Sequence, residues 1–96
     1  MGATAPQTVA FAVRGPIDSA DLPGLCDRVC ALLREADAHV AFCDIHGVQP
    51  SATTVDALCR LQLAARRLRC QVRLRNASDE LLELVAFMGL SDVLPD

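Results

Sequence analysis

Hydroxyl side chains gather in one short polar segment, residues 47–54, of an otherwise apolar chain. Ser51, Thr53 and Thr54 follow Pro50 and precede a helical pattern of apolar residues. A hydroxyl at the start of a helix can accept a hydrogen bond from a free backbone N–H, and the same positive end of a helix favours a phosphate. Thr53, with Asp56 three residues later, has nearly the form of a capping box. Thr53 is therefore a candidate N-cap.

The cysteines and histidines are the other residue types that could support chemistry. The five cysteines are Cys26, Cys30, Cys43, Cys59 and Cys70. The number of cysteines is odd, and residues 1–7 lack the basic and apolar regions of a signal peptide. Both observations argue against a disulfide framework. Cys43 and His46 lie three apart, a spacing that places them on opposite faces of a strand. No pair has a recognised zinc-ligand spacing, so we expect five reduced cysteines that act as small apolar residues, and no metal site.

Motifs for cofactor binding and catalysis are missing. The five glycines are scattered at positions 2, 15, 24, 47 and 89, so no phosphate loop or dinucleotide fingerprint is present. The sequence also lacks a Gly-x-Ser-x-Gly elbow and a convincing pair of carboxylates. It predicts a binding module that uses no cofactor and is not an enzyme.

Charge and hydropathy exclude two further classes of partner. The net charge is −3, and the only aromatic residues are three Phe, which argues against nucleic-acid binding. No apolar run approaches the roughly 20 residues that span a bilayer, so we expect no direct membrane insertion. We expect a cytoplasmic protein.

The candidate residues must be positioned by elements that alternate along the chain. Periodicity predicts strands at about 8–13, 38–45 and 70–74, and helices at 21–35, from 55 to 68, and from 79 to about 88. Ser78 is the expected cap of the last helix, which should end near Gly89. The predicted inward residues of the last two helices are Val55, Leu58, Leu61, Ala65, Leu68, Leu81, Leu84, Val85 and Met88. This order predicts one α/β domain, residues 8–96, with a mostly parallel sheet behind a flexible lead at residues 1–7.

Four segments in order resemble the STAS family, the fold of anti-sigma factor antagonists. The resemblance covers about residues 9–94. The segments are Val13-Arg14-Gly15-Pro16-Ile17-Asp18, Asp44-Ile45-His46-Gly47-Val48, Ala64-Ala65-Arg66-Arg67-Leu68-Arg69-Cys70, and Asn76-Ala77-Ser78-Asp79-Glu80-Leu81 with Met88-Gly89-Leu90-Ser91-Asp92-Val93-Leu94. The resemblance implies a mixed, mostly parallel sheet of four to five strands with helices packed against it.

The resemblance also implies a function, which is partner switching. The unphosphorylated domain binds an anti-sigma factor or serine kinase, and phosphorylation of a hydroxyl before the second helix separates the two proteins. The family's Asp-Ser-Ser-Gly motif is degenerate here, as Ser51-Ala52-Thr53-Thr54, so Thr53 takes the acceptor position, or Thr54 if the register slides by one. The implied partner-binding residues are Gln49, Pro50, Ser51, Ala52, Thr53, Thr54 and Asp56. The alternative is a STAS subunit that docks on the ATPase subunit of a lipid-asymmetry ABC transporter. A weak homodimer is a further alternative.

Overall fold

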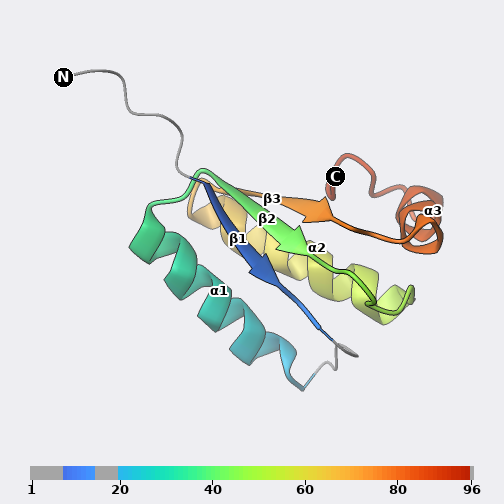
Figure 1. Ribbon diagram of the computed structural model, residues 1–96, viewed down its shortest axis with the longest axis horizontal. Helices are drawn as coiled ribbons and strands as arrows, with labels where there is room; N and C mark the ends of the chain where they lie inside the picture. The colour runs from blue at the N-terminus through green and yellow to red at the C-terminus, as the bar shows by residue number, and fades with distance from the viewer. Residues whose placement is uncertain (1–7, 15–19, 96) are drawn as a thin grey trace.

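The computed structural model describes residues 8–14 and 20–95, and the predicted lead at residues 1–7 lies outside that range. The elements alternate as β1 (Thr8–Ala12), α1 (Leu22–Ala36), β2 (Val40–Asp44), α2 (Ala52–Arg67), β3 (Gln71–Arg75) and α3 (Asp79–Phe87) (Figure 1). This order confirms the predicted α/β fold. Within the described ranges, no helix is long and apolar enough to cross a membrane.

The sheet has three parallel strands in the order β1-β2-β3, so the expectation of four to five strands is wrong for the described residues. The reason is visible at the outer edge of β3. There the N–H of Val72 donates to Gln62 Oε1 at 2.8 Å, and the N–H of Leu74 donates to the Pro95 carbonyl at 2.8 Å. Because a side chain and the C-terminal tail already satisfy this edge, no further strand pairs with it.

Two helices cover one face of the sheet. α1 packs along β1, α2 packs along β3, and the two helices contact each other (Figure 1). Right-handed crossovers between parallel neighbours place both helices on the same face. The strand residues that face the helices are every second residue of each strand, and α2 supplies most of the opposing side chains. The most deeply buried members of this core are Ala41, Cys43, Val55, Leu58, Leu61, Val72 and Leu74.

The last helix follows the sequence prediction at its start and departs from it at its end. Ser78 accepts a hydrogen bond from the Leu81 N–H at 3.1 Å, which confirms it as the N-cap. Leu81 and Val85 are buried, and Leu84 is half-buried. Met88 was expected inside but is 40% exposed, because α3 ends at Phe87 and Met88 is the C-cap. Gly89 follows with φ +75°, the left-handed conformation that ends many helices.

Candidate functional site at the carboxyl end of the sheet

The carboxyl ends of the three strands and the start of α2 lie at the same end of the domain (Figure 1). Parallel pairing dictates this, because each strand leaves the sheet at that edge before its helix returns. In open α/β sheets this edge is the usual place for binding sites. The polar segment that the sequence singled out, residues 47–54, is therefore presented where binding sites form.

Ser51, and not Thr53, caps α2. Ser51 has the extended backbone of an N-cap, with φ −139° and ψ 159°, and its Oγ accepts the Thr54 N–H at 3.2 Å. The predicted cap at Thr53 is wrong because the helix begins at Ala52, which puts Thr53 inside the first turn. Asp56, the expected far member of the capping box, instead forms an i, i+4 ion pair with Arg60 at 2.9 Å.

The two threonines that compete for the acceptor role have different environments. Thr54 is only 2% exposed, and its Oγ1 accepts a hydrogen bond from the Ser51 hydroxyl at 3.1 Å. Thr53 is exposed. Among the described residues, no side-chain hydrogen bond is formed by Thr53. The Thr53 hydroxyl is therefore accessible at the surface, whereas the Thr54 hydroxyl is occupied within the fold.

The other predicted contact residues surround Thr53 at the surface. Gln49, Ala52 and Asp56 are exposed, and Pro50 and Ser51 are half-buried. The structure thus brings together six of the seven predicted residues on one surface and places Thr54 beneath it.

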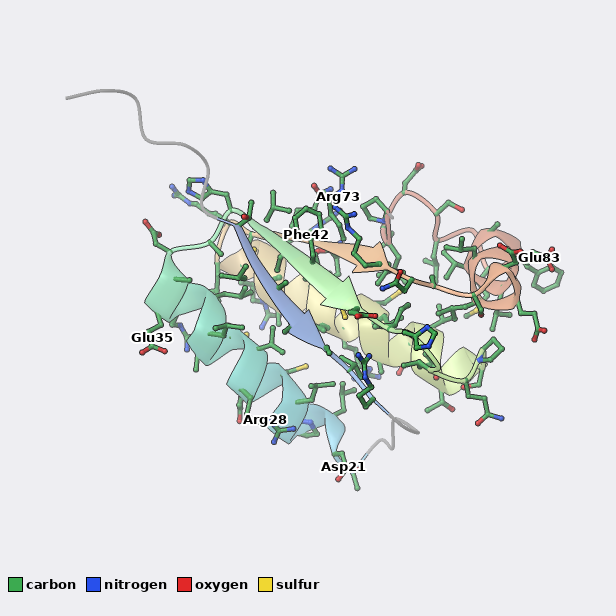
Figure 2. The ribbon with its side chains drawn as sticks, viewed as in Figure 1. Asp21, Arg28, Glu35, Phe42, Arg73 and Glu83 are labelled. Atoms are coloured by element: carbon green, nitrogen blue, oxygen red, sulfur yellow. The ribbon has the colours of Figure 1, made fainter. Side chains whose placement is uncertain are left out.

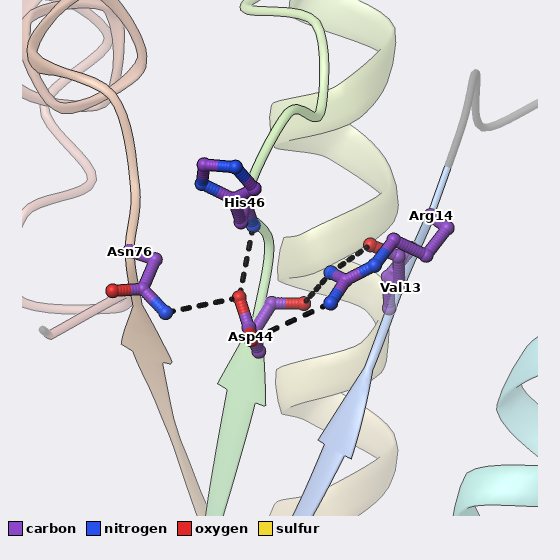
Figure 3. Close-up of polar contacts among 5 residues, drawn as sticks. All are labelled: Val13, Arg14, Asp44, His46 and Asn76. Carbon is purple, nitrogen blue, oxygen red and sulfur yellow. Dashed lines mark hydrogen bonds and ion pairs between the residues drawn. The ribbon is translucent and has the colours of Figure 1, made fainter.

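Asp44 is the centre of a polar cluster at this edge (Figure 3). Its Oδ1 accepts the backbone N–H of His46 at 3.0 Å and the side-chain N–H of Asn76 at 3.2 Å. Its Oδ2 lies 3.6 Å from the Arg14 guanidinium, which also donates to the Asp44 carbonyl at 3.4 Å. The His46 N–H, then the Asn76 amide, then Arg14 lower the pKa of Asp44, because each interaction favours the carboxylate.

This cluster joins the ends of all three strands. Arg14 follows β1, Asp44 ends β2, and Asn76, in the left-handed conformation with φ 59°, follows β3. In the sequence, Asp44 stands out only as the first residue of the motif Asp44-Ile45-His46-Gly47-Val48, and its role in joining the strand ends was not predicted. The feature that could have indicated this role is an aspartate at the end of a buried strand, because such a side chain can accept a hydrogen bond from the backbone N–H two residues later.

The cysteines and histidines do not converge on a site. Cys43 is buried, and burial, followed by the nearby Asp44 charge, raises the pKa of its thiol to about 12. His46 is exposed. The five thiols are unpaired, and no cluster of three His, Cys, Asp or Glu residues in residues 8–14 and 20–95 could hold a metal ion. Cys43 is thus a core residue whose thiolate is strongly disfavoured.

Comparison with protein-family models gives no match, and comparison with curated proteins gives no significant match.

Proposed function

We propose that this chain is a cytoplasmic protein-binding regulatory domain of the STAS type, related to the anti-sigma factor antagonists, and not an enzyme. It would work by partner switching with an anti-sigma factor or a serine kinase, under the control of phosphorylation at Thr53. The observation that carries the proposal is the exposed Thr53 hydroxyl in the first turn of α2, a turn whose cap is supplied by Ser51. Because the fold does not use this hydroxyl, it is available for regulation.

The helix start can accommodate a phosphate at Thr53. The first N–H groups of a helix have no intrahelical partner, and the helix dipole is positive at this end. A phosphoryl group adds about −1.5 to −2 charges, which both features stabilise. Asp56, one turn further along, is already paired with Arg60, so its repulsion of the phosphate is reduced. We therefore expect phosphorylation to leave the domain folded.

The same charge would oppose a protein partner. Ala52 and Thr53 are small, so a partner can approach the first turn of α2 closely. A dianionic phosphate between the two surfaces would have to lose water without gaining a protein cation, which costs several kcal/mol. A regulatory complex of micromolar affinity is held by about 8 kcal/mol, so this cost is sufficient to release the partner.

The test uses the wild type and four variants as baits in a pull-down from the native host, followed by affinity measurement with the recovered partner. Thr53→Asp should weaken binding at least tenfold with little change in melting temperature. Ala31→Asp is the matched control, because it adds the same charge on the exposed surface of α1 and should bind like the wild type. Ser51→Ala removes the true cap and should cost about 0.5–2 kcal/mol of stability. Thr53→Ala removes no cap, so it should lower the stability far less than Ser51→Ala does.

Two outcomes would decide against the proposal. Wild-type affinity for Thr53→Asp would show that the partner binds elsewhere. Recovery of a transporter ATPase subunit, with no phosphorylation of Thr53 by any co-purified kinase, would favour the alternative role as a permanent transporter subunit. Incubation with the recovered kinase and ATP, followed by mass spectrometry of the peptide that contains Thr53, distinguishes these cases.

A further inference from the structure

One face of the sheet is open. α1 and α2 cover the opposite face, and none of the described helices crosses this one (Figure 1). Strand register places its outward side chains in three rows: Thr8, Val40 and Gln71; Ala10, Phe42 and Arg73; and Ala12, Asp44 and Arg75. Figure 2 shows Phe42 and Arg73 projecting from the sheet on the side away from α1. We call these nine residues the open face.

The centre of the open face is apolar and incompletely buried. Phe42 and Val40, both on the middle strand, are half-buried. Sheets made only of parallel strands are nearly always covered on both faces, because their strands carry apolar side chains on both sides. β2 has this character, with Ala41 and Cys43 in the core and Val40 and Phe42 on the open face. The sheet therefore presents an apolar stripe that a second layer would bury.

The charges beside this stripe are positive. The guanidinium carbon of Arg75 lies 4.1 Å from the centroid of the Phe42 ring, so a cation–π contact places this charge over the Phe42 ring. Arg73, in the same row as Phe42, has no acidic partner among the described residues. The only carboxylate on the face, Asp44, is already bound to Arg14 and Asn76. A chain of net charge −3 thus concentrates unneutralised positive charge on one edge of an apolar surface.

The dimensions of the open face match one α-helix. Three strands about 4.8 Å apart span roughly 10 Å, which is the diameter of a helix. Five residues per strand extend roughly 17 Å, which ~12 helical residues would cover. Arg73 and Arg75 are two strand residues apart, about 6.6 Å, and residues i and i+4 of a helix are separated by about 6 Å along its axis. A hollow of about 480 Å³ is lined by Phe42 and by residues 73–77.

We propose that the open face binds an amphipathic helix of an acidic partner protein. The apolar stripe of that helix packs on Val40 and Phe42, and the small side chains of Ala10 and Ala12 allow it to approach β1. Two carboxylates at i and i+4 on one flank of the helix bind Arg73 and Arg75. The site is separate from the start of α2 and does not depend on phosphorylation at Thr53.

Charge selects this occupant over three others: a second copy of the chain, residues 1–7 of the same chain, and nucleic acid. Two copies of this chain packed face to face would bring four arginines together with no free carboxylate between them, which opposes self-association through this face. Residues 1–7 contain no acidic side chain, so they cannot neutralise Arg73 and Arg75. Nucleic acid is disfavoured by the net charge of −3.

The test is an amide NMR titration of the full chain with a synthetic peptide of ~14 residues, long enough to span the face as a helix. The probe peptide carries a leucine stripe flanked by glutamates at i and i+4, and a control peptide has lysines in place of the glutamates. We expect the glutamate peptide to shift the resonances of β1, β2 and β3 and to bind at least tenfold more tightly than the lysine peptide. Arg73→Glu with Arg75→Glu should remove this preference. Arg28→Glu with Arg34→Glu, an equal charge change on exposed α1 positions, should keep it.

Three results would overturn the proposal. They are equal affinity for the two peptides, shifts confined to the helices, and a glutamate peptide that does not bind. Concentration-dependent dimerisation of the wild type, abolished by Phe42→Ser, would assign the open face to a second copy instead. None of these results depends on the variants at Thr53, so this proposal and the proposed function fail separately.

Discussion

Gln62 is the residue whose replacement should most clearly test how this sheet is completed. It lies in the middle of α2, is 0% exposed, and makes three hydrogen bonds of 2.8 Å. Its Oε1 accepts the Val72 N–H, and its Nε2 donates to the carbonyls of Val72 and Val93. The side chain therefore occupies the place that a fourth strand would take beside β3, and it also ties the C-terminal tail to the sheet.

The substitution Gln62→Leu keeps the size and the helix propensity of the side chain but removes all three bonds. It leaves the N–H and the carbonyl of Val72 buried without these partners, since Val72 is 1% exposed. Each such group costs about 1–3 kcal/mol, and burial of the added apolar surface offsets roughly 1 kcal/mol. We expect a net loss of about 3 kcal/mol, which lowers the melting temperature of a domain of this size by roughly 10–20 °C.

Urea unfolding followed by circular dichroism measures this loss, and hydrogen exchange of the Val72 amide locates it. Gln71→Leu is the matched control, because it makes the same chemical change at an exposed position of β3 and should alter stability by less than about 0.5 kcal/mol. If Gln62→Leu unfolds at the same urea concentration as the wild type, the edge of β3 is not stabilised by this side chain. The explanation given above for a sheet of three strands would then be wrong.

Two further predictions concern titratable groups. The hydrogen bond from the His46 N–H is the main reason why the pKa of Asp44 lies below its ordinary value of 3.8. The bonds of this carboxylate therefore contribute to stability above pH 3.8, and the contribution is lost as the pH falls through the lowered pKa of the folded state. Acid titration of the melting temperature should therefore show a steeper fall below about pH 4 for the wild type than for Asp44→Asn, and equal slopes would refute the role of the cluster. Because burial raises the pKa of Cys43 to about 12, its thiol should resist alkylation at pH 8 in the folded protein, whereas the half-buried Cys30 reacts and all five cysteines react in denaturant.

The sequence was sufficient to predict the order of elements because each has a clear period or cap. The alternation of Val72 and Leu74 with polar neighbours marks β3, and Ser78 before two acidic residues marks the start of α3. Helix inward faces were also predictable, as Val55, Leu58 and Leu61 show. These features depend only on residues near each other in the sequence, so contacts with distant residues do not alter them.

Most of the errors came from features that depend on distant parts of the chain, whereas the cap of α2 is a local feature that residue type alone did not decide. Which hydroxyl caps α2 is decided by the residue at which the helix begins, and Ser51, Thr53 and Thr54 all suit the role by type. The burial of Gln62 could not be predicted from its neighbours, since its partners lie 10 and 31 residues away. Asp44 likewise acquires its role from Arg14 and Asn76, which only strand pairing brings near it. The number of strands was wrong for the same reason, because a side chain and the tail satisfy the edge of β3.

Asp44 also links the two surfaces proposed to bind partners. It is the last outward residue of β2 and so forms one corner of the open face, in the same row as Arg75. Its carboxylate holds the N–H of His46, the second residue of the connection that leads to Ser51 and Thr53. Asp44→Asn removes the charge that holds this N–H, so it should loosen the connection to Ser51 and Thr53 while leaving each surface in place, and faster hydrogen exchange of the His46 amide would show this.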